Sequence, residues 1–308
     1  MKSSLKIGTR GSKLALWQAD WVQSALEKAH PGIEVERVII KTRGDRIQDV
    51  PLAKVGGKGL FVKEIEEALL EGRIDLAVHS MKDMPGDIPP GLCIGPVPER
   101  EIPVDVLISG NGLKLAELEK GSTIGTSSLR RAAQLLHLRP DIDIVPLRGN
   151  LDTRLRKLDE GRMDAIVLAA AGVRRLGLEK RITEYLDPAC MLPAVAQGAL
   201  CIEIRESDPE TDNLVSILNH PETRAVVLGE RAFLHRLEGS CQIPVAGHGT
   251  LENGRFIIKG LVASLDGTVI LKDSIEGGGD RIRELGIELA EKLLARGADR
   301  ILKELTGE

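Results

Sequence analysis

The chain has 308 residues, a mass of 33.3 kDa and a net charge of −4, with 42% hydrophobic and 29% charged side chains. This composition is typical of a globular protein with two or three domains. The slight negative charge argues against a nucleic-acid partner, and an aromatic content of 2% leaves few platforms for stacked bases. Because no apolar run suits a signal peptide or a membrane span, we expect a cytoplasmic protein without a membrane partner.

The first third of the chain alternates strand-like and helix-like segments. Residues 5–9, 33–42 and 75–78 have the patterns of strands, and residues 14–29 and 61–71 have the spacing of amphipathic helices. This alternation predicts a mostly parallel sheet covered by helices.

A second set of such segments begins near Thr123 and repeats features of the first. A strand ends in Gly-Thr shortly before a helix at residues 8–12 and again at residues 125–131. A helix ends in Glu-Gly-Arg-x-Asp before a strand at residues 71–75 and again at residues 160–164. The same order twice predicts two related α/β domains, whose ligands would bind beyond the carboxyl ends of the strands.

The last third has a different pattern. Residues 200–205 resemble another strand, and two helical segments follow, at 209–220 and 221–237. Three alternating stretches then predict an antiparallel sheet: residues 245–251, 255–264 and 268–275, separated by Asn253-Gly254 and Asp266-Gly267. One amphipathic helix over residues 280–305 is expected to cover a face of that sheet, which gives a small α+β domain.

Positive charge is concentrated in residues 121–181, which carry twelve basic and seven acidic side chains. Ten of the basic residues are arginines, whose planar guanidinium groups bind carboxylates or phosphates through paired hydrogen bonds. A single such arginine more often belongs to a solvated helix face. Five of them, however, lie near strand carboxyl ends or helix amino ends: Arg130, Arg131, Arg148, Arg154 and Arg175. We predict that these five converge on one cleft and bind a small ligand with several negative groups, helped by a helix cap at Ser127 or Ser128.

A further charged pair, Lys82 and Asp83, directly follows a buried strand and would project from its carboxyl edge. A Lys–Asp pair on a loop is usually a surface pair, and the neighbouring His79 is as readily structural as functional. The glycines at residues 56–59 could cradle a phosphate, but their spacing does not match a nucleotide-binding loop.

The cysteines have no spacing typical of a zinc or redox site. Cys241 lies on a turn flanked by small residues, so we expect it to be the most accessible of the four, although a lone cysteine is more often buried. The other three lie in or beside apolar runs and are expected to be inert: Cys93, Cys190 and Cys201.

Together these segments resemble the porphobilinogen deaminase family over essentially the whole chain. The matching stretches are residues 10–15, 42–45, 54–61, 79–83, 125–131, 147–150 and 239–244. Two departures are visible: Ala196 stands where the family usually has glycine, and Cys201 replaces another small glycine.

The resemblance implies a transferase, hydroxymethylbilane synthase, that condenses four porphobilinogen molecules head to tail and releases four ammonia molecules. It implies a dipyrromethane cofactor, covalently attached to Cys241 through a thioether, that primes the growing chain. It also implies two periplasmic-binding-protein-like (type II) α/β domains plus a C-terminal α+β domain with a three-stranded antiparallel sheet. The expected boundaries are residues 1–99 with 200–217, residues 105–193 and residues 222–308.

The resemblance assigns roles to individual residues. Each pyrrole ring carries an acetate and a propionate, which suits guanidinium groups, and Asp83 would be the catalytic carboxylate that stabilises positive charge on the ring. The implied cofactor-binding residues, besides Cys241, are Lys82, Asp83, Ser128, Arg130, Arg131 and Arg154. The implied substrate-binding residues are Arg10, Ser12, Phe61, Arg148, Arg154 and Arg175. We expect a monomer without a metal ion.

A competing hypothesis is a non-catalytic, two-lobed module that binds an anionic metabolite. It would explain the repeated segments and the arginines, but it would give Cys241 no role. The mass of the purified protein distinguishes the two, because a binding module would keep the mass of its sequence.

Overall fold

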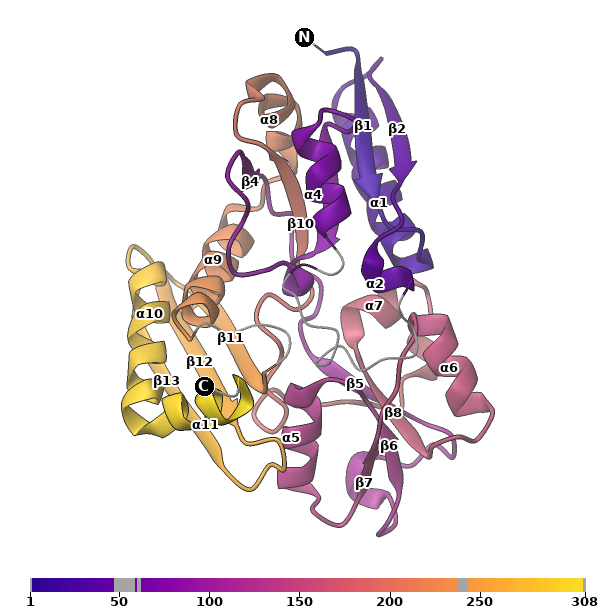
Figure 1. Cartoon of the computed structure of the whole chain (residues 1–308), viewed down its shortest axis with the longest axis vertical. Helices are drawn as coiled ribbons and strands as arrows, with labels where there is room; N and C mark the ends of the chain where they lie inside the picture. The colour runs from indigo at the N-terminus through magenta and orange to yellow at the C-terminus, as the bar shows by residue number, and fades with distance from the viewer. Residues whose placement is uncertain (1, 47–58, 60–61, 238–242, 307–308) are drawn as a thin grey trace. The chain divides into compact units, whose positions relative to one another are not determined.

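The structure, a computed structural model, describes residues 2–46, 59, 62–237 and 243–306 (Figure 1). The chain divides into two compact units, which we describe in turn. The first contains Met1–Glu101 and Ala199–Arg224, and the second contains Ile102–Gly198 and Ala225–Glu308. The chain therefore passes from the first unit to the second and back before it ends in the second.

The first unit is built on a five-stranded sheet in the order β2-β1-β3-β10-β4. Its strands are β1 (Ser4–Thr9), β2 (Glu34–Ile39), β3 (Leu76–Ser80), β4 (Leu92–Ile94) and β10 (Leu200–Arg205). β1 pairs in parallel with β2 and β3, whereas β10 runs antiparallel to its neighbours β3 and β4. The carboxyl ends of β1, β2 and β3 therefore lie at one edge of the sheet, together with the amino end of β10.

Helices cover both faces of this sheet. The longest is α1 (Lys13–Ala29), which packs Val22 and Leu26 against strand residues such as Val78, while α4 (Lys63–Leu70) packs Ile65 against the other face. The other helices described in this unit are short: α2 (Arg43–Arg46), the 3-10 turn η1 (Met81–Asp83), α8 (Pro209–Val215) and η4 (Ser216–Leu218). Buried apolar residues on both faces account for the nearly continuous apolar pattern of β3 and β10.

The second unit contains a sheet of the same design, in the order β7-β6-β8-β5-β9. Its strands are β5 (Asp105–Ser109), β6 (Thr123–Gly125), β7 (Asp143–Val145), β8 (Ala165–Ala169) and β9 (Glu184–Tyr185). β6 pairs in parallel with β7 and β8, and β5 is antiparallel to both β8 and β9. Its helices are η2 (Leu115–Glu117), α5 (Leu129–Leu138), α6 (Leu151–Asp159), α7 (Ala170–Arg175) and η3 (Glu179–Arg181).

The predicted internal repeat is confirmed down to individual contacts. In the first unit the turn before β3 has Gly72 at a φ of 72°, and in the second the turn before β8 has Gly161 at a φ of 69°. The aspartate that ends each motif accepts a hydrogen bond from the backbone of the neighbouring strand. Asp75 accepts from the N–H of Lys6 at 2.8 Å, and Asp164 accepts from the N–H of Thr123 at 2.7 Å.

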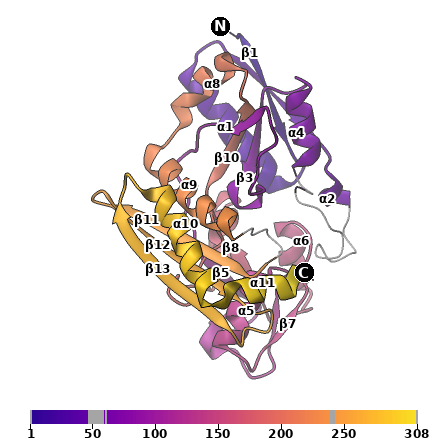
Figure 2. The ribbon, with the colours of Figure 1, turned by 60° about the vertical axis from the view of Figure 1, so that its left-hand side comes forward.

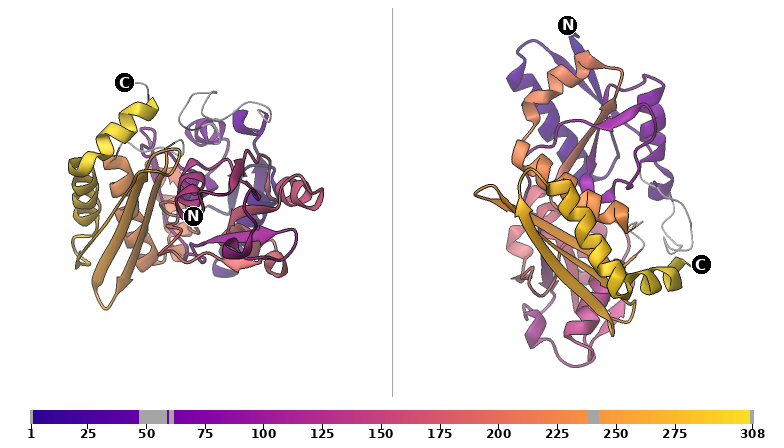
Figure 3. Two further views of the ribbon diagram at one scale, coloured as in Figure 1. Left: turned by 90° about the horizontal axis from the view of Figure 1, so that it is seen from below. Right: turned by 90° about the vertical axis from the view of Figure 1, so that its left-hand side faces the viewer.

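The second unit also holds a three-stranded antiparallel sheet in the order β11-β12-β13. Its strands are β11 (Val245–Glu252), β12 (Arg255–Ala263) and β13 (Ile270–Gly278), and the helix α9 (Pro221–Arg236) precedes them. Between β11 and β12, Asn253 and Gly254 have φ values of 50° and 75°, so both residues adopt the left-handed conformation of the predicted tight turn. Figure 2 and the right-hand view of Figure 3 show α10 (Ile282–Leu293) lying across one face of this sheet.

The prediction of a single C-terminal helix over residues 280–305 is wrong in one respect. After α10 the chain forms one π-helical turn, Leu294–Ala298, and then α11 (Asp299–Thr306). Gly297 within that turn has a φ of 101°, a conformation that interrupts the helix and that glycine adopts without steric cost. The apolar periodicity continues through the break, which is why the pattern alone did not reveal it.

The C-terminal sheet packs against the five-stranded part of the second unit. Ala133 of α5 and Leu192 share a buried cluster with Ala246 of β11 and Leu261 of β12. The boundaries of a separate third domain stay a prediction.

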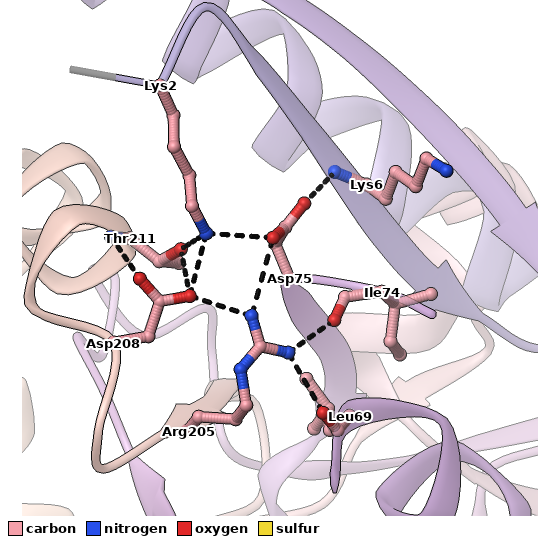
Figure 4. A network of polar contacts seen from close by, with 8 residues as sticks. All are labelled: Lys2, Lys6, Leu69, Ile74, Asp75, Arg205, Asp208 and Thr211. Atoms are coloured by element: carbon pink, nitrogen blue, oxygen red, sulfur yellow. Dashed lines mark hydrogen bonds and ion pairs between the residues drawn. The ribbon is translucent and has the colours of Figure 1, made fainter. Parts of the chain in front are cut away.

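At the opposite edge of the first sheet from the strand carboxyl ends, an ion network joins three segments (Figure 4). The ammonium of Lys2 lies 2.8 Å from Asp75 and 2.7 Å from Asp208, and Arg205 lies 2.7 Å from Asp208. Burial alone would raise the pKa of the Asp208 carboxyl, but hydrogen bonds from Lys2, Thr211 and Arg205 hold that pKa well below its usual range. This network ties the amino-terminal strand to the segment after β10.

Candidate functional site

In the first unit, Lys82 and Asp83 occupy the 3-10 turn that directly follows β3. The Asp83 side chain is exposed, and Lys82 is half-buried. The turn is held in place, because the N–H of the buried Met81 donates to the carbonyl of Ala199 at 3.0 Å and Met84 is also buried. The structure thus places this pair at the carboxyl edge of the sheet, as the sequence predicted.

Arg10 and Ser12 follow β1 and lie at the same edge, because β1 and β3 run in parallel. The Oγ of Ser12 accepts a hydrogen bond from the N–H of Ala15 at 3.3 Å and so caps α1. A second contact braces this edge: the amide of Gln18 in α1 donates to the Oγ of Ser80 at 2.9 Å. Helix α1 therefore supports the strand end that carries the Lys–Asp turn.

His79 has the surroundings of a structural residue rather than a functional one. His79 is 6% exposed, and its Nε2 lies 3.1 Å from the Oε2 of the fully buried Glu203 on β10. Glu66 of α4 is also buried, and in the described part of the chain its Oε1 has no hydrogen-bond partner. Burial, together with the nearby charge of Glu203, raises the pKa of Glu66 to about 7. The sequence analysis did not identify this buried acidic pair.

In the second unit, the candidate residues lie at the matching edge of the sheet. Ser128 and the arginines of α5 follow β6, Arg148 follows β7, and Arg175 ends the helix that follows β8. Because β5 is antiparallel to β8, its first residue, Asp105, pairs with Ala169 at this same edge. The topology thus brings a carboxylate next to the predicted arginines.

Arg130 and Arg131, which we call the arginine pair, are each only 5% exposed and bind the fully buried Asp105. The Nη1 of Arg130 lies 2.7 Å from Oδ2 of Asp105, and it also donates to the carbonyl of Leu192 at 2.8 Å. Arg131 donates to Oδ1 of Asp105 from Nε at 3.0 Å and from Nη2 at 2.7 Å. Burial alone would raise the pKa of Asp105, but the two guanidinium charges hold it well below its usual range.

This arrangement corrects the expectation that the arginine pair lines an open cleft. Both guanidinium groups bind Asp105. The helix cap also differs from the prediction. Ser128 is the N-cap residue of α5, yet its side chain makes no capping hydrogen bond, and the Oγ of Ser127 instead bonds the backbone of Leu147. The two guanidinium groups and one carboxylate still leave one positive charge in excess.

The other three arginines, Arg148, Arg154 and Arg175, lie on segments that follow β7 and β8 at the same edge. Arg148 is half-buried in the segment between β7 and α6. The Nε of Arg154 donates to the carbonyl of Gly149 at 2.8 Å, and the Nη2 of Arg175 donates to the carbonyl of Gly198 at 2.7 Å. These backbone contacts hold the guanidinium groups of Arg154 and Arg175 in place.

Several predicted features lie outside the described residues, namely Cys241, Phe61, Gly56 and Gly57. Of the other cysteines, Cys201 is buried and Cys93 is half-buried, but Cys190 is exposed, against the expectation from its apolar surroundings. Within the described ranges, no group of His, Cys, Asp and Glu side chains is arranged to hold a metal ion. No helix in these ranges is long and apolar enough to cross a membrane.

The two five-stranded sheets have the same spatial arrangement of parallel and antiparallel strands, and each carries charged side chains at the carboxyl edge of its parallel strands. Together with the C-terminal antiparallel sheet, they define a protein with two related α/β lobes. Among solved structures, an ancestral arginine-binding protein bound to arginine is similar, with 15% identity, a TM-score of 0.40, and coverage of 71% of this chain and 91% of that one.

Sequence comparison identifies the family. Residues 5–213 match the family model "Porphobilinogen deaminase, dipyromethane cofactor binding domain", and residues 225–295 match "Porphobilinogen deaminase, C-terminal domain". The porphobilinogen deaminase of Syntrophotalea carbinolica is 57% identical over 98% of this chain and 96% of the relative. That of Geobacter sulfurreducens is 55% identical over 98% of this chain and 94% of the relative. The chain therefore belongs to the porphobilinogen deaminase family.

Proposed function

We propose that this protein is a transferase that condenses porphobilinogen head to tail into hydroxymethylbilane, with release of ammonia, in tetrapyrrole biosynthesis. We propose further that it is primed by a covalent dipyrromethane cofactor and acts as a cytoplasmic monomer. Its family membership supports the reaction, and the observation that carries the site is the buried arginine pair at the carboxyl edge of the second sheet.

The described residues fit an anionic cofactor. The arginine pair and Asp105 together carry one excess positive charge in a buried place, where an uncompensated charge is costly. The Nε and Nη2 of Arg130 make no hydrogen bond to any described residue, so they remain as donors for a carboxylate. An acetate or propionate of the cofactor would supply the missing negative charge.

In this proposal the cofactor is attached through the sulfur of Cys241. Its carboxylates are held by charged and hydroxyl side chains: Lys82, Ser128, Arg130, Arg131 and Arg154. When bound, the cofactor supplies the free pyrrole carbon at which the chain is extended. The role of the arginines is to bind and orient, because a guanidinium fork fixes a carboxylate in direction as well as in distance.

Asp83 is proposed as the catalytic carboxylate. Loss of ammonia leaves positive charge on the incoming pyrrole ring, and a fixed carboxylate beside the ring N–H stabilises that charge. The same carboxylate can then accept the proton that leaves the ring carbon after coupling. The anchored turn that carries Asp83 suits this task, because its backbone is bonded to the carbonyl of Ala199 and its two methionines are buried.

The incoming porphobilinogen carries one acetate and one propionate. We propose that Arg10, Arg148, Arg154 and Arg175 bind these groups, that Ser12 orients them, and that Phe61 packs on the ring. Arg10 and Ser12 lie on the segment after β1, and Arg175 is braced by the carbonyl of Gly198.

The intact mass of the purified protein tests the proposed function. The proposal predicts a mass excess equal to two deaminated porphobilinogen units, which is lost in Cys241→Ala and kept in the control Cys190→Ala. Cys190 suits as the control because its thiol is exposed. An unmodified protein that turns over porphobilinogen would contradict the cofactor assignment. An unmodified protein without that activity would favour the anion-binding module.

A further inference from the structure

Gln197, in the segment 193–198, is fully buried and contacts Asp105, the carboxylate that binds the arginine pair. Its Nε2 donates to Oδ1 of Asp105 at 3.0 Å and to the carbonyl of Pro103 at 2.6 Å. Both partners can only accept, so the amide nitrogen must face them. Gln197 thus binds the same carboxylate oxygen as Arg131 and fixes that carboxylate to the segment before β5.

The residue before it, Ala196, has a φ of 57°, in the left-handed region that favours glycine. This conformation costs an alanine roughly 1 kcal/mol, so surrounding contacts must hold it. The N–H of Ala196 donates to Oε2 of Glu230 at 2.6 Å, and Oε1 of the same carboxylate accepts from the N–H of Gly249 at 2.7 Å. Glu230 is fully buried in α9. Its two hydrogen bonds link the strained Ala196 to Gly249 of β11.

From these contacts we propose that Glu230 is a positioning residue for the arginine pair. It acts by keeping Ala196 in its left-handed conformation, which places the Gln197 amide on Asp105. The inference rests on the proposed function, since it assigns the arginine pair to a carboxylate of the dipyrromethane. It identifies three residues that the sequence analysis did not assign to the site: Glu230, Gln197 and Asp105.

The chemistry of Glu230 shows why a neutral amide should not replace it. A carboxylate offers an acceptor on each oxygen, and both are used by backbone N–H groups. Gln at this position would have one acceptor, and its NH₂ group would face a second donor. One buried N–H would then lose its partner, and the strain at Ala196 would no longer be balanced. A glycine at position 196 would remove the strain and with it much of the need for the carboxylate.

The first test compares Glu230→Gln, the double variant Glu230→Gln/Ala196→Gly and the control Glu276→Gln, whose carboxylate is an exposed partner of Arg255. We expect Glu230→Gln to lower the fraction of purified chains that carry the dipyrromethane mass by at least threefold. We expect the double variant to recover most of that loss and the control to match the parent. If Glu230→Gln lowers only the melting temperature, or if glycine at 196 restores nothing, the proposal is wrong.

Hydrogen exchange gives a readout that does not depend on the reaction. Glu230→Gln should speed hydrogen exchange at the N–H of Ala196 and in α5. The double variant should bring the exchange of α5 back near that of the parent. If Glu230→Gln leaves exchange in residues 193–198 and in α5 unchanged, the coupling is absent. An unmodified parent protein would contradict the proposed function alone, and the exchange result would still decide the coupling.

A second variant keeps the proposal testable if Glu230→Gln does not fold. Gln197→Met keeps a side chain of similar length but removes both amide donors. It should lower the modified fraction as Glu230→Gln does. Glycine at position 196 should not rescue it, because relief of the strain at Ala196 cannot replace the missing amide that binds Asp105. A Gln197→Met protein that is fully modified would overturn the proposal.

Discussion

Replacing Asp105 by asparagine would remove the carboxylate that binds the arginine pair. The side chain is fully buried, and four hydrogen bonds from charged or amide donors end on its two oxygens. The substitution keeps the shape but raises the local excess from one buried positive charge to two. Breaking a buried ion pair in this way costs about 3–5 kcal/mol, because the partner charges stay buried without compensation. For a protein of this size that loss lowers the Tm by roughly 6–20 °C.

Urea unfolding and thermal melting of Asp105→Asn measure this effect. The matched control is Asp159→Asn, which removes an exposed carboxylate 2.5 Å from Arg181 and should change the free energy of unfolding by less than about 1 kcal/mol. Because the folded-state pKa of Asp105 lies below its unfolded value of about 3.9, its contribution is full above that pH and is lost as the pH falls further. The gap between the parent and Asp105→Asn should therefore narrow below about pH 4. A loss of less than about 1 kcal/mol at neutral pH would refute the reasoning.

Three further variants test other parts of the structure. Arg131→Lys keeps the charge, but an ammonium cannot reproduce the contacts that three guanidinium nitrogens make with Asp105 and the carbonyl of Val167. The free energy of unfolding in urea should therefore fall by about 1.5–3 kcal/mol. An unchanged midpoint of unfolding would contradict this. Glu66→Gln should be more stable than the parent by about 1–3 kcal/mol at pH 8 and nearly as stable as the parent at pH 4. The reason is that the folded-state pKa of Glu66, about 7, exceeds its unfolded value, so the parent loses stability as the pH rises from the unfolded pKa to the folded one. A stability difference that does not depend on pH would be inconsistent with the raised pKa. Ala196→Gly should raise the free energy of unfolding by up to about 1 kcal/mol by relieving the left-handed strain, and a clear loss of stability would contradict it.

Local sequence patterns predicted most of the fold because the relevant signals are short. The Asn253-Gly254 turn, the strand at residues 200–205 and the strand before Lys82 all depend on residues that are neighbours in the chain. The internal repeat was visible for the same reason, since its aspartates at positions 75 and 164 play the same part in each unit. Gly297 shows the limit, because one left-handed residue divides a helix without altering its apolar periodicity.

The interior of the candidate site could not be predicted in this way. The arginine pair was expected to face a ligand directly, whereas both groups bind Asp105, which comes from a strand inserted antiparallel into the sheet. The spacing of these residues does not predict that contact, because Asp105 and the arginines meet only through the pairing of β5 with β8 in the folded sheet. One signal was present: an aspartate opening an otherwise apolar strand, which must be paired if it is buried.

Ala196 is a different case. Its departure from the family's usual glycine was visible in the sequence, but its consequence was not, since a positive φ is a property of the backbone. The structure supplies that consequence, together with the carboxylate of Glu230 that balances the strain.

The central claim is that Asp83 supplies the negative charge that drives the chemistry, and single-turnover release of ammonia tests it most directly. The measurement uses folded Asp83→Asn protein whose cofactor loading is confirmed by mass, mixed with porphobilinogen in a rapid-quench experiment. Asparagine keeps the shape of the exposed side chain on its anchored turn while removing the charge. The account predicts that ammonia release slows by at least about 100-fold, the scale for loss of one electrostatic stabiliser, and that Asp83→Glu retains partial activity. Release of ammonia by Asp83→Asn at the parent rate would contradict it.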